Sequence, residues 1–284
     1  MSLKSRFRSK RIWDELIDYA LSEDGARTDW TSLGLSNAHK KVHATIFSKQ
    51  DFILAGLDIA AQTFHRLADT PIVWMTEVND GERVMAGQPL ARLAAEAWVI
   101  LGGERAALNF LQRLSGVATV TRSYVDKVAG TRAKVVDTRK TTPGMRGLEK
   151  YAVRCGGGYN HRFGLNDGCL IKDNHIRLAG SIKEAVGTIR QNIPHLWKIE
   201  VEVETLEQLK ECLGLGIEAV LLDNMPVSMM KQAVEIVQGK MLVEASGGIN
   251  LDNIAEVAQT GVDLISIGGL THSAQAVDIN LELD

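Results

Sequence analysis

The chain has 284 residues, of which 45% are hydrophobic and 24% charged, and its formal net charge is −3. This composition predicts a globular protein of one or two domains, and the slight acidic excess argues against general binding to nucleic acid or to a membrane surface. No stretch approaches the length of apolar sequence that spans a bilayer, and the basic N-terminus leads into charged residues rather than the apolar core of a signal peptide. Three cysteines without CxxC spacing favour a reducing compartment, which we take to be the cytoplasm.

The first hundred residues predict a small unit of helices and short strands. Helical spacing of apolar residues occurs at 10–22 and 55–67. The expected strands are 42–48, 73–77, 84–85 and 90–93. The longest periodic segment, 104–129, predicts a helix that joins this unit to the rest of the chain.

From residue 134 the pattern changes to short apolar runs that alternate with helical segments. The expected strands are 134–136, 169–171, 198–203, 219–222, 241–244 and 264–267. The expected helices are 147–154, 181–191, 205–213, 227–237 and 250–259. This alternation predicts an α/β fold of parallel strands, either a shortened barrel of the TIM type or an open doubly wound sheet. The GxGxxG fingerprint of dinucleotide-binding sheets is absent.

Charged residues or glycines follow every one of these strands. In barrels of this kind, function is built at the carboxyl ends of the strands. The residues at those ends, in chain order, are Thr138-Arg139-Lys140, Lys172, Glu202, Asp223, Ser246-Gly247-Gly248 and Gly268-Gly269. We therefore expect one functional rim.

The glycine pairs after the last two strands predict a phosphate site. Glycine lets the backbone approach an anion, and phosphate in barrels commonly lies at these two loops. Glu202 and Asp223 end neighbouring strands, so their carboxylates could hold Mg²⁺ together with a substrate phosphate, although a structural acidic pair is the alternative.

The segment between Arg139 and Lys172 is strongly cationic. It holds seven Lys or Arg residues against two acids, Glu149 and Asp167. Arginine is the natural bidentate partner of a carboxylate, so Arg139, Arg162 and Lys172, with His161, could hold a substrate that carries more than one carboxylate. Lys140 is better suited to a phosphate or pyrophosphate.

The run DTRKTTPGMRGLEKYAVRCGGGYNHRFGLNDGCLIKDNHI, residues 137–176, resembles the signature of quinolinate phosphoribosyltransferase, the carboxylating nicotinate-nucleotide pyrophosphorylase. EVEVE at 200–204, LLDN at 221–224, EASGGI at 244–249 and SIGGLTHS at 266–273 are similar to further motifs of that family in the same order. The resemblance implies an N-terminal α/β sandwich domain and an incomplete α/β barrel. We expect the first at 1–103, completed by the tail 274–284, and the second at 104–273.

The resemblance also implies an activity: transfer of phosphoribosyl from phosphoribosyl pyrophosphate to quinolinate, with loss of CO₂, in NAD biosynthesis. The residues that it assigns to quinolinate are Arg105, Thr138, Arg139, His161, Arg162 and Lys172. Those that it assigns to phosphoribosyl pyrophosphate are Lys140, Glu202, Asp223, Ser246, Gly247, Gly248, Gly268, Gly269 and His272. Mg²⁺ would be held by Glu202 and Asp223, and we expect Lys140, Lys172, Glu202 and Asp223 to be catalytic. Arg105 would enter the site of a partner subunit, which implies a homodimer or a larger assembly.

Three other functions are compatible with parts of this pattern. One is a related phosphoribosyltransferase that uses nicotinate or belongs to the branch associated with molybdate transport. Another is a lyase that forms a Schiff base on Lys172. The third is a barrel that binds a phosphate ligand without catalysis.

Overall fold

The structure is a computed structural model that describes residues 10–284, with side chains described from residue 13 onward. The residues before Lys10, which carry most of the basic N-terminus discussed above, lie outside the described residues. The described residues form two compact units: those from 10 to 120, 142–157 and 274–284 belong to the first, and residues 121–141 and 158–273 to the second. Residues 104–120 and 142–157, which were expected in the barrel domain, thus lie in the first unit.

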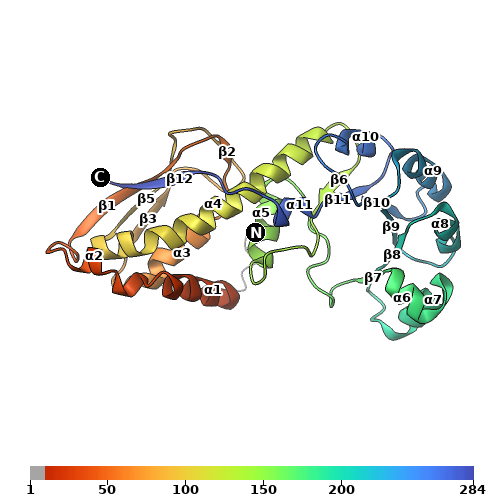
Figure 1. The fold of residues 1–284 in the computed structure, drawn as a ribbon, viewed down its shortest axis with the longest axis horizontal. Helices are drawn as coiled ribbons and strands as arrows, with labels where there is room; N and C mark the ends of the chain where they lie inside the picture. Colours follow the sequence, from red (N-terminus) through yellow and green to blue (C-terminus); the bar gives the residue numbers. More distant parts are fainter. Residues whose placement is uncertain (1–9) are drawn as a thin grey trace. The chain divides into compact units, whose positions relative to one another are not determined.

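The first unit is built on a four-stranded antiparallel sheet of order β12-β1-β5-β3. Its strands are β1 (Lys41–Ser48), β3 (Val73–Thr76), β5 (Pro89–Glu96) and β12 (Ile279–Leu283). Helices α1 (Lys10–Glu23), α3 (Leu57–Leu67) and the first part of α4 (Ala97–Lys127) cover one face of this sheet (Figure 1). The smaller elements are η2 (Ala26–Thr28), α2 (Trp30–Leu33), β2 (Phe52–Ile53), β4 (Arg83–Val84) and α5 (Arg146–Cys155). The C-terminal tail therefore completes the N-terminal sheet, because β12 pairs along β1.

Helix α4 begins at Ala97, seven residues before the start expected from periodicity at 104. The sequence pattern did not predict these first turns because they contain Gly102 and Gly103, and glycine usually destabilises a helix interior. Here they allow close packing. A Cβ at residue 102 would lie 2.7 Å from the carbonyl oxygen of Ala26, and one at residue 103 would lie 2.8 Å from the ring of Phe64. The helix is thus maintained by packing rather than by local propensity.

The second unit is a six-stranded parallel sheet of order β6-β11-β10-β9-β8-β7, which confirms the predicted strands and the α/β barrel class without a closing pair between β6 and β7. Its strands are β6 (Lys134–Val136), β7 (Cys169–Ile171), β8 (Ile199–Val203), β9 (Ala219–Asp223), β10 (Leu242–Ser246) and β11 (Leu264–Ser266). Its helices are α6 (Asp173–Ala179), α7 (Ile182–Asn192), α8 (Leu206–Cys212), α9 (Val227–Val237), α10 (Ile254–Ala258) and α11 (Gly269–His272). The strands follow an arc, and α7 to α10 lie on its outer side (Figure 1).

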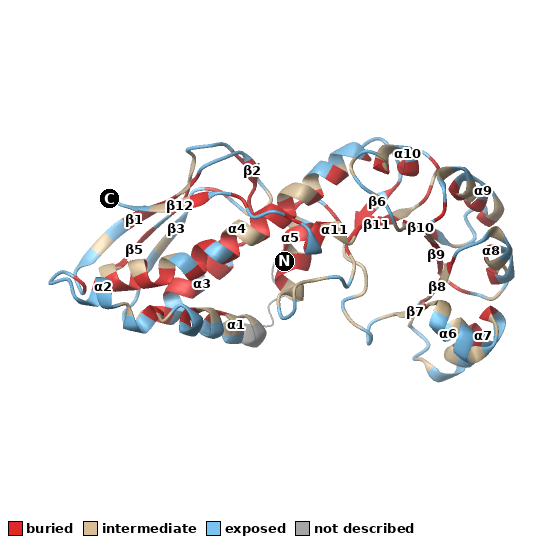
Figure 2. Cartoon of the chain, viewed as in Figure 1, coloured by how far each residue is buried: buried red, intermediate tan, exposed pale blue. Residues whose placement is uncertain are grey.

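The core of this unit lies between the strands and the outer helices. In β8 the residues Ile199, Val201 and Val203 are buried, and the intervening Glu200 and Glu202 face the other side of the strand. Helix α9 buries Met230, Ala233 and Val237 at helical spacing, and Figure 2 shows its buried residues turned toward the strands. The glutamates are therefore presented to the concave side of the arc, where the site lies.

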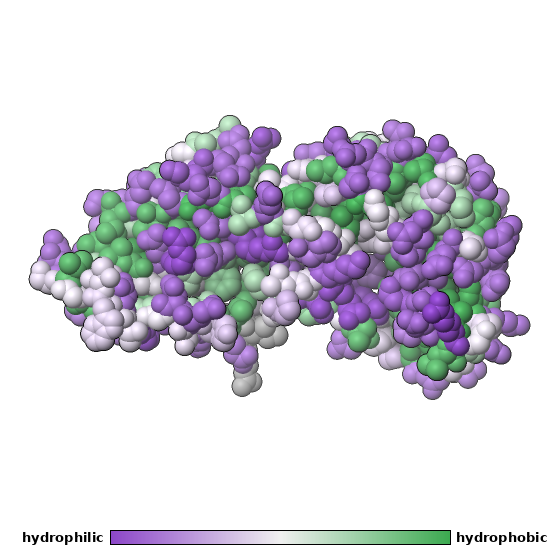
Figure 3. All heavy atoms as spheres, viewed as in Figure 1, coloured by the Kyte–Doolittle hydropathy of each residue, from purple (hydrophilic) through white to green (hydrophobic). Residues whose placement is uncertain are grey.

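Three helices of this unit differ from the sequence prediction, and the short α11 after β11 is one that was not expected. Helix α6 follows β7 directly and was not expected; its start is fixed by His175, whose Nδ1 accepts the backbone N–H of Lys172 at 2.9 Å. Helix α10 begins four residues later than expected, because Asn250 accepts the N–H of Asp252 at 2.9 Å in a local turn. None of the described helices has the length and apolar character needed to cross a membrane, and hydrophilic side chains cover much of the visible face of both units (Figure 3).

Gly116 offers a test of the first unit's packing. A Cβ at this position in α4 would lie 2.0 Å from the carbonyl oxygen of Gln275, in the segment that leads to β12. We predict that Gly116→Ala lowers the free energy of unfolding by about 1–3 kcal/mol through this overlap. The matched control is Gly187→Ala in α7, where no atom lies within 4 Å of the added Cβ and a gain of about 0.5–1 kcal/mol is expected. Denaturant unfolding of both variants measures the difference, and equal stabilities would contradict it.

Candidate active site

A cavity of about 320 Å³ opens at the carboxyl ends of the strands in the second unit. It brings together nine of the residues predicted from sequence: Thr138, Arg139, Lys140, His161, Arg162, Lys172, Glu202, Asp223 and Ser246. Four further residues line it: Leu170, Leu221, Glu244 and Ser266. Four cations and three carboxylates therefore share one small space.

The loop after β6 carries the first group of cations. The hydroxyl of Thr138 accepts the backbone N–H of Lys140 at 3.0 Å, and the hydroxyl of Thr271 donates to the carbonyl of Lys140 at 2.6 Å. Gly268 leaves room for the lysine side chain, because a Cβ there would lie 3.0 Å from Lys140 Cδ and 3.1 Å from His272 Nε2. The loops after the first and last strands are thus fixed against each other, with Lys140 and His272 beside Gly268 and the backbone of Gly269 next along the chain.

The acids come from β8 and β9, which are neighbours in the sheet. The ammonium of Lys172 contacts the carboxylate of Glu202 directly. The carboxylate of Asp223 accepts a hydrogen bond from the side-chain amide of Asn224 at 2.9 Å. Each acid is therefore held by a donor at the rim.

The backbone geometry after β10 requires Gly247 and Gly248, in addition to the role in anion binding that the sequence predicts for them. Gly247 and Gly248 have φ of +88° and +64°, a region that favours glycine. A Cβ on Gly247 would lie 2.2 Å from Oδ1 of Asn224, which itself has φ of +53°. The loop after Ser246 can therefore pass close to the end of β9 only because residue 247 has no side chain.

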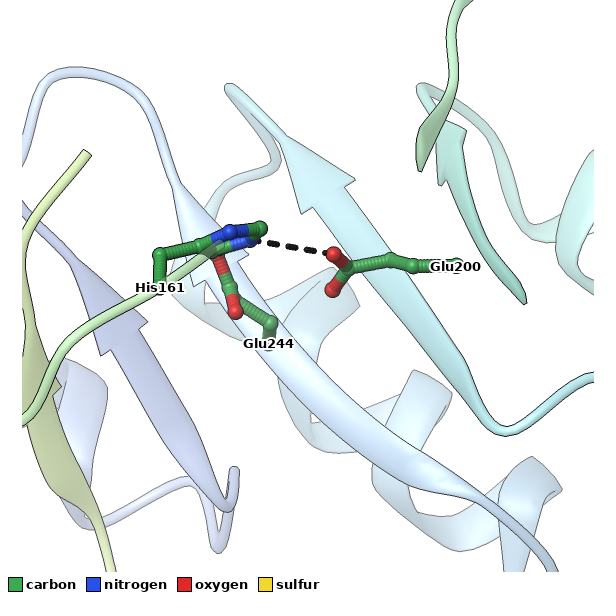
Figure 4. Close-up of side chains that lie close together, drawn as sticks. All are labelled: His161, Glu200 and Glu244. Atoms are coloured by element: carbon green, nitrogen blue, oxygen red, sulfur yellow. Dashed lines mark hydrogen bonds and ion pairs between the residues drawn. The ribbon is translucent and has the colours of Figure 1, made fainter. Parts of the chain in front are cut away.

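His161, Glu200 and Glu244 lie close together, and His161 and Glu244 line the cavity (Figure 4). His161 Nε2 lies 3.1 Å from Glu200 Oε2 and 3.7 Å from Glu244 Oε1. A second hollow, of about 360 Å³, is lined by all three of these residues and by Arg162, so His161, Arg162 and Glu244 line both spaces. Neither Glu200 nor Glu244 had a predicted role, although the period of two in EVEVE places Glu200 on the same face as Glu202.

Glu244 is the most deeply buried acid of the site, with 1% of its surface exposed. Burial raises its pKa from the ordinary 4.5 to about 7, and the neighbouring charge of Glu200 adds to the shift. Burial likewise lowers the pKa of Arg162, and the positive charge of Arg139 acts in the same direction. Burial and a neighbouring like charge thus shift both pKa values in the direction that favours the neutral form.

Asp137 is a further residue whose role the sequence pattern did not indicate. It is fully buried, and its carboxylate accepts the backbone N–H of His161 at 2.9 Å and the side-chain amide of Asn160 at 2.6 Å. It therefore anchors the segment that delivers His161 and Arg162. The available signal in the sequence was its place directly after the apolar strand 134–136.

Arg105 lies in the first unit, on α4, and lines a separate hollow of about 470 Å³ together with Tyr19, Asn109 and Arg113. It is the one predicted substrate residue that belongs to that unit. Glu204, the third glutamate of EVEVE, is exposed and does not line the cavity.

Fold and site together define a two-unit α/β protein whose barrel gathers cations and acids around one cavity, beside glycine loops. The family model for the quinolinate phosphoribosyl transferase C-terminal domain matches residues 117–282, and the model for the N-terminal domain of the same family matches residues 29–115. The chain belongs to the quinolinate phosphoribosyltransferase family.

Individual relatives agree with this assignment over nearly the whole chain. The nicotinate-nucleotide pyrophosphorylase [carboxylating] of Mycobacterium leprae is 44% identical over 275 residues, which cover 95% of this chain and 96% of the relative. The chloroplastic protein of that name from Arabidopsis thaliana is 38% identical, with coverage of 95% and 82%. The solved structure of the nicotinate-nucleotide pyrophosphorylase from Francisella tularensis superposes with a TM-score of 0.92 at 38% identity and covers 96% of each chain.

The buried carboxyl of Glu244 predicts a pH dependence of stability. The native carboxyl keeps its proton up to about pH 7, whereas the unfolded one ionises near its ordinary pKa of 4.5. The native state therefore binds more protons in this window, so the stabilising contribution is full below pH 4.5 and is lost as the pH rises through 7.

We predict that Glu244→Gln, which cannot ionise, gains stability relative to the wild type by on the order of 3 kcal/mol between pH 4.5 and pH 8. Thermal or denaturant unfolding at several pH values measures this difference. Glu204→Gln is the matched control for an exposed glutamate. A difference between Glu244→Gln and the wild type that stays constant with pH would show that Glu244 is ionised throughout.

Proposed function

We propose that this protein transfers the phosphoribosyl group of phosphoribosyl pyrophosphate to quinolinate, releasing pyrophosphate and CO₂ and forming nicotinate mononucleotide for NAD biosynthesis. The observation that carries the proposal is the convergence of Arg139, Lys140, Arg162 and Lys172 with Glu202 and Asp223 on one cavity. A dicarboxylate and a pyrophosphate ester are both highly anionic. A site that binds them needs this excess of fixed cations.

In this proposal the cationic side of the cavity holds quinolinate. Arg139 and Arg162 take the carboxylates, with Lys172 and the hydroxyl of Thr138 completing the set. The guanidinium of Arg162 donates to the carbonyl of Gly168 at 3.0 Å, which leaves further donors of the same group for a carboxylate. Fixed donors of this kind orient the ring nitrogen toward the second substrate.

The phosphate side is assigned to the last two loops. Ser246, Gly247, Gly248, Gly268 and His272 would surround the 5′-phosphate, and the backbone of Gly269 adjoins them. The ammonium of Lys140, packed over Gly268, would stabilise the pyrophosphate as it leaves. The pyridine nitrogen then forms its bond to the anomeric carbon while the bond to pyrophosphate breaks.

The donor set fits Mg²⁺. Glu202 and Asp223 present hard carboxylate oxygens from adjacent strands, and only one oxygen of each is occupied by the contacts with Lys172 and Asn224 described above. When bound there, Mg²⁺ would neutralise the pyrophosphate and help to position the ribose hydroxyls. Glu202 and Asp223 would position the ribose together with the backbone amides of the loop after Ser246.

Loss of CO₂ follows from the charge on the substrate ring. Once the ring nitrogen carries the ribose it is cationic, so the electron pair left when the C2–carboxylate bond breaks is stabilised beside it. That carbon then takes a proton. The cavity residues need only hold the ring and the remaining carboxylate in place, so electrostatic positioning supplies the catalysis.

The alternative functions are less well supported by the geometry. A Schiff base would require a neutral Lys172, whereas its ammonium contacts Glu202. A nicotinate-specific enzyme would need fewer cations than the cavity supplies, and a non-catalytic binding barrel would not need acids opposite a phosphate loop. The proposal includes a cytoplasmic enzyme that is at least a homodimer, with Arg105 completing the site of a partner subunit.

The direct test is to mix the protein with quinolinate, phosphoribosyl pyrophosphate and Mg²⁺, and to look for nicotinate mononucleotide by chromatography. Nicotinate in place of quinolinate separates the rival enzymes, because only quinolinate also yields CO₂.

Arg162→Ala should cost roughly 2–5 kcal/mol in substrate affinity or turnover, since it leaves a buried carboxylate unpaired. Arg177→Ala, an exposed arginine on α6, is the matched control. Wild-type kinetics in a folded Arg162→Ala protein would contradict the proposal that Arg162 binds a carboxylate of quinolinate.

Removal of metal gives an independent prediction. Turnover should stop in excess EDTA and return when Mg²⁺ is restored, because the leaving pyrophosphate needs a counter-charge. Glu202→Gln and Asp223→Asn should each raise the Mg²⁺ concentration required for half-maximal rate. Undiminished turnover in EDTA would contradict the metal site.

A further inference from the structure

The contacts of His161 constrain its protonation. The backbone N–H of Arg162 donates to His161 Nδ1 at 2.7 Å, so Nδ1 must present a lone pair. A neutral imidazole then carries its proton on Nε2. That nitrogen points at Glu200 Oε2, 3.1 Å away, with Glu244 Oε1 next at 3.7 Å (Figure 4). Both ring nitrogens are therefore engaged inside the protein.

This arrangement argues against two other roles for the ring. A metal ion bound by His161, Glu200 and Glu244 would need a lone pair on Nε2, and Nδ1 already uses the only lone pair of the neutral ring. An imidazolium that binds a substrate carboxylate would place a proton on Nδ1 against the Arg162 N–H. Either role would require the contact with Arg162 to break.

The cluster is anchored on all sides by groups from different strands. Asp137, after β6, accepts the backbone N–H of His161 at 2.9 Å. Glu200 comes from β8 and Glu244 from β10. The side chains of His161, Glu200 and Glu244 expose only 14%, 13% and 1% of their surfaces, so these contacts lie largely out of water and are stronger for it.

The raised pKa of Glu244 is consistent with this picture. Near neutral pH burial keeps a proton on that carboxyl for part of the time, which limits the negative charge that would otherwise draw a second proton onto the ring. The groups that face the ring include Glu200, Glu244, the backbone of Arg162 and, through the main chain, Asp137.

We propose that His161 is a positioning residue: a neutral imidazole, whose Nε2–H donates to Glu200, fixes the backbone of Arg162 through Nδ1 so that the guanidinium faces the cavity. The consequence for quinolinate rests on the proposed function, whereas the tautomer does not. Glu200 is a positioning residue of the same cluster, and it acts on the substrate through His161 and Arg162.

The tautomer is tested on the full-length protein labelled with ¹⁵N-histidine and observed by long-range ¹H–¹⁵N correlation without ligand. The signals of His161 are those that His161→Asn removes. The expected result is one protonated nitrogen, Nε2, and one unprotonated nitrogen, Nδ1, from pH 6 to pH 8. An imidazolium, an Nδ1–H tautomer, or loss of the Nε2–H signal on addition of Zn²⁺ or Mg²⁺ alone would each overturn the proposal.

Two substitutions separate positioning from direct binding. Asparagine places an oxygen where Nδ1 lies, so His161→Asn keeps the acceptor for Arg162. Glutamine places its amide near Nε2, so His161→Gln keeps the donor to the acids and loses that acceptor. Loss of one such hydrogen bond should raise the KM for quinolinate roughly tenfold in His161→Gln, against roughly threefold or less in His161→Asn. The KM for phosphoribosyl pyrophosphate should stay constant in both.

Equal losses in the two variants would overturn the proposal, because neither carries the charge that a ligand role requires. Glu204→Gln, an exposed glutamate at the end of the same strand as Glu200, is the control and should behave as wild type. The proposed function fails separately: in that case the wild type yields no nicotinate mononucleotide, while the ligand-free spectrum still reports the tautomer.

Discussion

The site depends on one constraint, the parallel pairing of all six strands of the second unit. Parallel strands deliver all their carboxyl ends to one edge, so residues spread from Thr138 to Ser266 line a single cavity. No local element could gather them, because the cations, acids and glycine loops come from different strands. The register makes the arrangement specific. Ser246 pairs with Asp223, which sets the glycine loop that we propose binds phosphate beside an acid.

Within that edge, charges are balanced before any substrate arrives. Lys172 contacts Glu202, Asn224 donates to Asp223, and Arg162 donates to the carbonyl of Gly168. A preorganised set of this kind does not have to reorganise when anionic substrates bind, which is where electrostatic catalysis gains most. The same balance limits self-repulsion among four neighbouring cations.

The sequence predicted the parts of the site that depend on position along a strand. Lys172, Asp223 and Ser246 follow apolar runs, so their place at the strand ends could be read directly. The sequence did not predict which side chains of the site contact one another. A period of two places Glu200 on the inner face, but the meeting with His161 and Glu244 depends on strand order and on the path of residues 158–168. The start of α4 was missed for a similar reason, since Gly102 and Gly103 are helical only because of what packs against them.

The central claim is that the segment from Arg139 to Lys172 recognises two carboxylates at once. Calorimetric titration of the protein with quinolinate, nicotinate and picolinate tests it most directly, because the second and third ligands each lack one carboxylate. Quinolinate should bind at least roughly tenfold more tightly than either, since a charge-assisted hydrogen-bonded contact contributes about 1.5–3 kcal/mol. Equal affinities for the three acids would contradict the account.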